Sequence, residues 1–318
     1  MAKIQNEFRA ADMTCKIFYT GGVLATIKGE IDSNAITIMS HGDTLGAMVR
    51  CLMPDGRIGL SKLGGFFWEV IHGENAMLKT STGTLYSGTI LYDEASYHIN
   101  KEMQSKKWTD HSMYFRIDQQ VNSKKELEDL GIQLGDFITF DPRPQWTDSG
   151  FIKSRFLDDK ASVAVMLTLA RTLATEKFTP ARTVHFLITP AEEIGLGGSI
   201  GVPEATGDLI AIDIGVVGKN QNSSESTVTI CAKDSANIFD VPLRQHLIKL
   251  AQKNALPYVI DILYYYGSDI FPALSSGIDA RTALIGPGVH NSHGYERTHL
   301  LALKATHDLL YHFLRQPI

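Results

Sequence analysis

The chain of 318 residues is poor in cysteine, and nothing about its three cysteines indicates a disulfide framework. Cys15, Cys51 and Cys231 lie far apart, are odd in number and form no CxxC pair. A chain of this length can bury a sufficient hydrophobic core without disulfide bonds. This cysteine usage is typical of a reducing compartment rather than of a disulfide-stapled secreted scaffold.

Long apolar segments and basic clusters are also missing. No stretch approaches the roughly 18 consecutive apolar residues of a membrane span, and the first residues, MAKIQNEFRAADM, lack the apolar segment of a signal peptide. The net charge is -5 and the runs of Lys and Arg are short, whereas a nucleic-acid-binding surface needs a concentrated basic patch. We therefore expect a cytoplasmic protein that binds neither a membrane nor a nucleic acid.

Motifs for nucleotide binding are absent as well. The sequence contains no GxGxxG after its first apolar run and no GxxxxGK[ST]. The glycine-rich string GLGGS at 195–199 lacks the spacing of either fingerprint. A nicotinamide or nucleotide enzyme is therefore not expected, although the pattern of elements is that of an α/β protein.

Short apolar runs alternate with segments of helical periodicity. The runs that read as buried strands cover 35–41, 183–190, 208–216 and 281–287. Apolar residues at helical spacing occur in 160–174, 241–254 and 300–315. This alternation predicts an α/β fold with a central sheet covered by helices on both faces.

The sequence pattern changes between about residues 48 and 150, where strands no longer alternate with long helices. Short β-prone pieces are punctuated there by glycines, and the string ELEDLGIQLGDFITF predicts a short helix, a turn and a strand. We interpret 48–150 as a small β-rich domain inserted into a catalytic α/β domain formed by 1–47 and 151–318.

Titratable residues follow the predicted strands at their carboxyl ends. These residues are His41 and Asp43, the pair Asp158-Asp159, the pair Glu192-Glu193, Asp213, and the histidines His290 and His293. Ligands of open α/β sheets bind outside the carboxyl ends of the strands. The residues are therefore predicted to converge on one site.

Two histidines with several carboxylates suit Zn²⁺, Co²⁺ or Mn²⁺. Two such ions can share one carboxylate and one water, which uses five ligands and leaves a carboxylate as general base. The pair Glu192-Glu193 can supply a ligand and a base. Each piece has a simpler reading: Asp158-Asp159 could cap a helix, and the Glu pair could be an exposed loop. Asp213 is harder to dismiss because an unpaired carboxylate in an apolar run is costly.

Six strings occur in the order found in one family: HGDTLG, FLDDKAS, AEEIGLGGS, IAIDIG, YGSDI and SHGYERTH. From about residue 35 to 300 the chain resembles the glutamyl-aminopeptidase-like zinc metallopeptidases, co-catalytic metallo-exopeptidases that include the tetrahedral TET aminopeptidases. The resemblance implies a mixed central sheet, two divalent ions with zinc expected, and a dimerisation role for the inserted domain. It also implies a homodimer or a dodecamer.

The resemblance further implies a role for each matching residue. One metal would be held by His41, Asp158 and Asp213, and the other by Asp158, Glu193 and His293, with Asp158 shared. Glu192 resembles the general base that deprotonates a water between the metals, and Asp43 resembles the carboxylate that orients the first histidine.

The chain departs from the family pattern at three places. Ala191 stands where relatives usually have Gln, and Lys160 stands where an Arg commonly follows the Asp pair. Lysine keeps the charge but cannot form a bidentate contact. The string GPGVHNSHGYERTH replaces the usual last-ligand motif, so His290 is the alternative to His293.

The expected activity is that of a dinuclear metal-dependent aminopeptidase acting on short peptides. The altered last loop leaves open a deacylase or amidase that acts on N-acylated amino acids or a small acylated dipeptide osmolyte. Tyr295, Arg297 and His299 could then line a pocket for an acidic or acylated group, or be ordinary loop residues. A metal-free scaffold is disfavoured because every candidate ligand is present.

Overall fold

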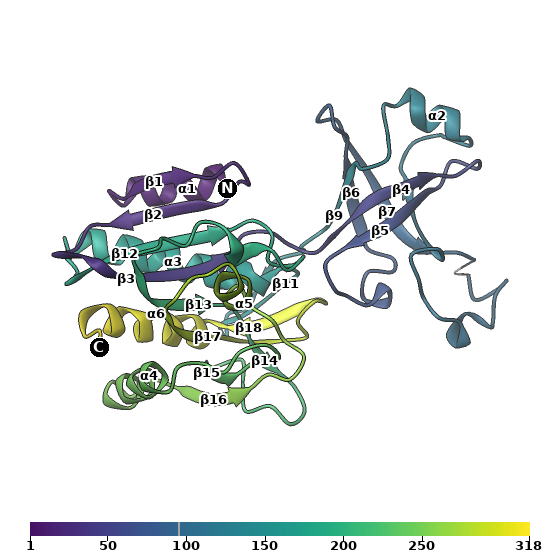
Figure 1. Cartoon of the computed structure of the whole chain (residues 1–318). Helices are drawn as coiled ribbons and strands as arrows, with labels where there is room; N and C mark the ends of the chain where they lie inside the picture. Colours follow the sequence, from purple (N-terminus) through teal and green to yellow (C-terminus); the bar gives the residue numbers. More distant parts are fainter. Residues whose placement is uncertain (95) are drawn as a thin grey trace. The chain divides into compact units, whose positions relative to one another are not determined.

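A computed structural model describes residues 1–94 and 96–318, which divide into two compact units (Figure 1). The sheet unit comprises 1–43, 144–292 and 296–318, and the barrel unit comprises 44–143 and 293–295. The predicted inserted domain, 48–150, overlaps most of the barrel unit, which also includes 293–295 of the last loop.

The elements alternate as the periodicity predicts. The helices are α1 (Ala2–Ala10), α2 (Lys124–Asp129), α3 (Leu157–Thr175), α4 (Val241–Lys253), α5 (Ile270–Ser275) and α6 (Leu300–Arg315), with short 3-10 turns η1 (Trp68–Val70), η2 (Met103–Ser105) and η3 (Gly197–Ser199). The sheet-unit strands are β1 (Thr14–Ile17), β2 (Val23–Ile27), β3 (Ile31–His41), β10 (Gln145–Trp146), β11 (Phe151–Ser154), β12 (Arg182–Thr189), β13 (Thr206–Ile212), β14 (Gly215–Val217), β15 (Val228–Lys233), β16 (Tyr258–Ile262), β17 (Arg281–His290) and β18 (Glu296–His299). The barrel-unit strands are β4 (Gly46–Leu52), β5 (Ile58–Leu63), β6 (Asn75–Lys79), β7 (Leu85–Tyr92), β8 (Met113–Ile117) and β9 (Phe137–Phe140).

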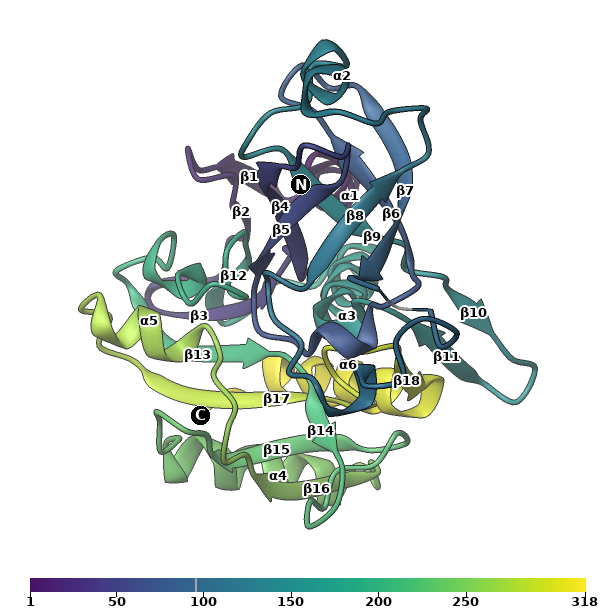
Figure 2. The ribbon, with the colours of Figure 1, turned by 90° about the vertical axis from the view of Figure 1, so that its right-hand side faces the viewer.

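The strands of the sheet unit form one mixed sheet. Its centre is parallel, in the order β12-β3-β13-β17, while β2 joins β12 and β15 joins β17 in antiparallel fashion. Figure 2 shows β12, β3, β13, β17, β15 and β16 following one another across the unit. The predicted α/β class with a mixed central sheet is confirmed.

Successive side chains of the central strands point to opposite faces. On β3, Ile36 and Ile38 belong to a core that includes residues of α3, α4 and α6, whereas Met39 belongs to a core that includes residues of α5. The central strands therefore read as continuous apolar runs because both faces are covered. This burial fixes the register and brings the polar residues that follow the strands to one edge.

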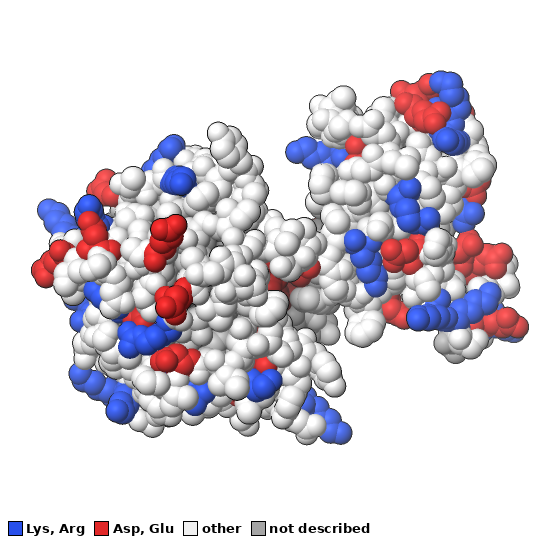
Figure 3. All heavy atoms as spheres, in the orientation of Figure 1, with Lys and Arg blue, Asp and Glu red and all other residues white. Residues whose placement is uncertain are grey.

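The barrel unit is a closed antiparallel barrel in the order β4-β5-β8-β7-β6-β9. Closure leaves the barrel without a free edge. The predicted helix, turn and strand at 126–140 correspond to α2 and β9. On the face visible in Figure 3, each unit carries basic and acidic side chains interspersed.

The structure also differs from the predicted elements. The run 208–216 is not one strand, because it breaks after Ile212 where the Asp213 carboxylate accepts the N–H of Ile214 at 2.7 Å. The strands that were not predicted lie outside the parallel centre of the sheet: β1, β2, β10, β11, β15, β16 and β18. Among the described helices, none has the length and apolarity needed to cross a membrane.

Candidate metal centre

Three parallel strands end at the same edge of the sheet. His41 is the last residue of β3, the Glu192-Glu193 pair follows β12, and Asp213 follows β13. Because β3 pairs in parallel with both β12 and β13, these residues emerge side by side.

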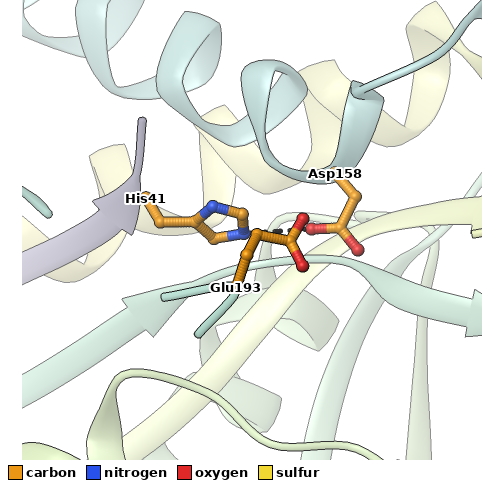
Figure 4. A group of neighbouring side chains, drawn as sticks. All are labelled: His41, Asp158 and Glu193. Carbon is orange, nitrogen blue, oxygen red and sulfur yellow. Dashed lines mark hydrogen bonds and ion pairs between the residues drawn. The ribbon is translucent and has the colours of Figure 1, made fainter. Parts of the chain in front are cut away.

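His41 and Asp158 are in direct contact, although they lie far apart in the sequence. The Nε2 atom of His41 lies 3.0 Å from Oδ1 of Asp158, the second residue of α3 (Figure 4). Asp158 is held on two further sides: Ser292 Oγ donates to its Oδ2 at 3.1 Å, and its N–H donates to Glu296 Oε2 at 3.0 Å. Glu296 is buried. The last loop therefore fixes Asp158 through residues on both sides of 293–295.

The candidate ligands form two overlapping groups that share His41. One contains His41, Asp158 and Glu193, and the other contains His41, Asp159 and Asp213; within each group the donor atoms lie within 4.8 Å of one another. Figure 4 shows the Glu193 carboxylate beside the His41 ring and the Asp158 carboxylate. The second group differs from the implied set because it contains Asp159 rather than Asp158.

Asp159 is fully buried and only half satisfied. Ser40 Oγ donates to its Oδ2 at 2.5 Å, while its Oδ1 has no hydrogen-bond partner among the described residues. Burial and the negative field of Asp213 and Asp158 raise the pKa of Asp159 well above its ordinary value. A buried carboxylate oxygen without a proton donor is costly unless a cation binds it.

The neighbouring carboxyls have raised pKa values for the same reasons. Burial, followed by the field of Asp158, raises the pKa of Asp213 to about 7. Burial, followed by the field of Asp213, raises the pKa of Glu192 to about 9. Burial lowers the pKa of His41, but hydrogen bonds to Asp158 and Asp43 outweigh it and place this pKa well above the ordinary value. Burial and mutual repulsion thus disfavour the ionised form of several of these carboxyls.

Asp43 links the histidine to the glutamate pair. Its Oδ1 lies 3.5 Å from His41 Nδ1, and its two oxygens accept the N–H groups of Glu192 and Glu193, each at 3.1 Å. Burial raises the pKa of Asp43, but these partners outweigh burial and the pKa is lowered. The ionised Asp43 carboxylate thus holds together the end of β3, at His41, and the segment after β12, at Glu192 and Glu193.

Lys160 binds the same region. Its Nζ donates to the carbonyl oxygen of Gly42, between His41 and Asp43. Burial lowers the pKa of this amine, against the field of Asp43, Asp159 and Glu193. The Lys160 ammonium thus makes one hydrogen bond to the Gly42 carbonyl, and a lysine cannot form the bidentate contact that an arginine could.

The two candidate last-loop histidines are absent from both ligand groups found among the described residues. His290 ends β17 and is exposed. His293 groups with the barrel unit, where its Nδ1 hydrogen-bonds the carbonyl oxygen of Gly65. Because a carbonyl only accepts, Nδ1 carries the proton and a neutral ring keeps its lone pair on Nε2. The role of His293 as a ligand stays a prediction.

One half-buried residue at the site was not assigned from the sequence. The Tyr266 hydroxyl lies 3.2 Å from the N–H of Ile214 and is hydrogen-bonded to the Asp213 carboxyl, which lowers the pKa of that carboxyl. The string YGSDI contains this tyrosine, but nothing in the string indicates that its partner is the residue directly after β13.

The residues considered for an acyl pocket have other partners. Tyr295 donates its hydroxyl to the carbonyl oxygen of Arg143 at 2.8 Å. Arg297 pairs with Glu225 at 2.8 Å, and His299 accepts the N–H of Leu301 at the start of α6. These contacts favour ordinary structural roles in the loop.

The donor set fits divalent cations. It combines imidazole with buried carboxylates, the ligands that Zn²⁺, Co²⁺ and Mn²⁺ accept, and it contains the half-satisfied Asp159.

Comparison with known proteins decides the family. A sequence model described as "M42 glutamyl aminopeptidase" matches residues 21–309. The chain belongs to the M42 glutamyl aminopeptidase family. Membership of the M42 family makes this protein a peptide-bond hydrolase, an aminopeptidase, and the resemblance read from the six strings is confirmed.

Relatives and solved structures agree with M42 membership. The chain is 43% identical over 300 residues to a Bacillus subtilis protein named "Putative aminopeptidase YhfE", covering 94% of this chain and 87% of that protein. A TET aminopeptidase structure from a marine sediment Thaumarchaeota archaeon superposes with a TM-score of 0.89 at 18% identity, covering 99% and 91% of the two chains. The Pyrococcus horikoshii TET1 peptidase, described as assembling into a tetrahedron or an octahedral shell, gives 0.85 at 20% identity, covering 98% and 92%. At these identities the two structures show the shared fold.

Proposed function

We propose that this M42 protein is a dinuclear metal-dependent aminopeptidase that removes N-terminal residues from short peptides. The observation that carries the proposal is the pair of overlapping donor groups around His41 at the carboxyl edge of the sheet. Family membership gives the aminopeptidase activity, and the excess of buried carboxylates supports two cations.

His41, Asp158 and Asp213 would hold one ion, and Asp158, Glu193 and His293 the other. The contacts of Ser292 and Glu296 with Asp158 support a last-loop ligand, because these residues flank 293–295 in the chain. The proton on His293 Nδ1 supports coordination through Nε2. Two divalent ions, with zinc expected, would supply Lewis acidity toward the peptide carbonyl and acidify a water.

Glu192 is the proposed general base. It takes the proton from the attacking water and passes it to the leaving amine, so the carboxyl returns to its starting state after each turnover. The 3.9 Å separation of Glu192 Oε2 from His41 Nε2 places this carboxyl beside the ligands. Asp43 fixes the backbone at Glu192 and thereby orients the base.

Asp159 is an alternative to Asp158 as partner of Asp213 and His41. Asp158→Asn and Asp159→Asn separate the two assignments when metal stoichiometry is measured in both. We expect the Asp158 variant to lose both ions, because Asp158 is shared, and the Asp159 variant to retain them with lower affinity.

The protein is also proposed to form a homo-oligomer, a dimer or a dodecamer, in which the barrel unit makes the dimer contact. This rests on the TET1 peptidase of Pyrococcus horikoshii, which is described as forming large assemblies. Light scattering of the purified chain measures the mass. A monomer at working concentrations would contradict the proposal.

Hydrolysis of matched peptides tests the proposed activity. The purified protein is assayed on a panel of dipeptides with free amines and on the same dipeptides N-acetylated, before and after chelation. We expect chelator-sensitive release of amino acids from the free-amine panel. Hydrolysis restricted to the acetylated panel would replace the proposal with a deacylase, and chelator-resistant hydrolysis would refute the metal mechanism.

A further inference from the structure

Asp269 is a buried carboxylate that belongs to neither candidate ligand group. It precedes α5, is 3% exposed, and its Oδ2 accepts the hydroxyl of Thr189 at 2.5 Å. Thr189 is itself fully buried and is the last residue of β12. The carboxylate therefore binds the point at which the chain leaves the sheet toward Glu192 and Glu193.

The same aspartate contacts the other end of that segment. The backbone of Gly198 donates a hydrogen bond to the Asp269 carboxylate. A Cβ placed on Gly197 would lie 1.9 Å from Asp269 Oδ1, and one on Gly198 would lie 1.9 Å from the Asp269 carbonyl oxygen. No side chain fits at these distances, so the two glycines allow the close approach of Asp269.

Residues 190–198, which we call the Glu-pair loop, are thus held at three places. Asp43 binds the N–H groups of Glu192 and Glu193 in the middle, while Asp269 binds Thr189 before the loop and the glycines at its end. Within the loop, Gly195 donates to the Glu192 carbonyl at 2.7 Å and Leu196 to the Ala191 carbonyl at 2.9 Å. These internal bonds shape the loop but do not attach it to the sheet.

Burying the Asp269 carboxylate at this position costs free energy. Burial raises the pKa of Asp269 to about 6, against the hydrogen bond from Thr189 and the field of His41. Its Oδ1 has no hydrogen-bond partner among the described residues. Burying a carboxylate costs free energy that its hydrogen bonds must offset, and here those bonds come from Thr189 and Gly198, the two ends of the loop.

We propose that Asp269, together with Thr189, is a positioning residue that clamps both ends of the Glu-pair loop and so holds Glu192 and Glu193 in place for the reaction. This inference rests on the proposed function for its kinetic consequence only. Misplacement of a base by a fraction of an ångström lowers the rate of the chemical step more than substrate binding. The clamp therefore acts on kcat rather than on KM.

The test compares Thr189→Val, Asp269→Ala and Asp269→Asn with the wild type. Valine replaces threonine in shape and removes one hydroxyl, so this variant is expected to fold. Amide hydrogen exchange over 190–198 is measured on each metal-loaded protein, together with kcat and KM on a free-amine dipeptide. We expect exchange in the loop to rise, and kcat to fall about tenfold with KM within about twofold, for Thr189→Val and Asp269→Ala. Asp269→Asn retains an acceptor and partly restores both readouts.

Two control variants test whether the effect is specific to Asp269 and Thr189. Gly267→Ala alters the same turn at a site with open space, and Asp279→Asn removes an exposed charge nearby in sequence. Both are expected to match the wild type, whereas Gly197→Ala should reproduce the Asp269→Ala behaviour. Unchanged exchange over 190–198 in Thr189→Val and Asp269→Ala overturns the clamp. If the wild type cleaves no dipeptide, the proposed function fails, and the exchange measurement still decides the clamp.

Discussion

Strand β13 has a buried aspartate near each end, and their surroundings are opposite. Asp208, near the start, is fully buried and contacts two guanidinium groups, that of Arg182 and that of Arg281 at 2.7 Å. Asp213, directly after the strand, is buried beside other carboxylates and has its pKa raised to about 7. One chain segment thus carries a compensated and an uncompensated negative charge.

The difference separates two uses of a buried charge. Asp208 has its partners in the protein, and with them it ties together the starts of β12, β13 and β17. Asp213 instead contacts the N–H of Ile214 and the hydroxyl of Tyr266, and it belongs to a donor group with His41 and Asp159. A buried charge without a protein partner is costly, and divalent cations are the partners that the donor types accept.

The largest expected effect follows from removing the shared carboxylate. Asp158→Ala should abolish binding of both ions and lower kcat/KM by about 10⁴-fold, since a metal contributes several kcal/mol to transition-state stabilisation. Metal content and peptide hydrolysis are measured on the same preparation, with Asp279→Asn as the control. Two tightly bound ions in the Asp158 variant would refute its place in the site.

Removal of the base should separate metal binding from turnover. Glu192→Gln should retain both ions and lower kcat by about 10³-fold, because the amide cannot accept the proton of the water. Stoichiometry is checked by elemental analysis and kcat by initial rates. Full activity of the variant would exclude Glu192 as the base.

The two aspartates of β13 should respond oppositely in the metal-free protein. Asp208→Ala leaves Arg182 buried without its partner and should lower the free energy of unfolding by about 3–5 kcal/mol. Asp213→Asn removes repulsion from Asp158 and should leave stability unchanged or higher. Denaturant unfolding in chelator measures both, and equal destabilisation would contradict the distinction drawn here.

The raised pKa values of Asp213 and Glu192 should make the stability of the metal-free protein depend on pH. The carboxyl pKa values of Asp213 and Glu192 are raised in the fold, to about 7 and about 9, so the folded state binds more protons than the unfolded state. The contribution of these two carboxyls to the stability of the metal-free protein is therefore complete below about pH 4, the range of an unfolded carboxyl. It is lost as the pH rises through the folded pKa values of about 7 and about 9. The raised pKa of His41 acts in the same direction.

Thermal unfolding of the metal-free protein between pH 5 and 8 measures this trend. We expect the midpoint to fall by several degrees as pH rises, and Asp213→Asn to flatten the slope. A midpoint that rises over this interval would contradict the assignment of excess negative charge.

Several candidate site residues could be predicted to meet from one rule about parallel sheets. Parallel strands end at one edge, so His41, Glu192 and Asp213 were predicted to meet before any contact was known. Their burial follows from the apolar runs that precede them. The frequent glycines predict a β-rich insert at 48–150, but nothing in the sequence pattern predicts that its strands close into a barrel.

Other features depend on backbone details that a pattern does not encode. Asp158 and Asp159 have non-helical dihedral angles at the start of α3, which turn both carboxylates toward the ligand edge. Tyr266 and Asp269 come from one loop without periodicity. Their positions are set by packing of α5 against the sheet and by the glycines that admit Asp269.

We expect the carboxyl edge of the sheet to bind two divalent ions that the activity requires. Titration of the chelated protein with Zn²⁺, followed by hydrolysis of free-amine dipeptides at each step, measures this directly. Two ions should bind per chain, and activity should appear as they bind. No zinc binding, or activity that is already complete without added metal, would contradict this expectation.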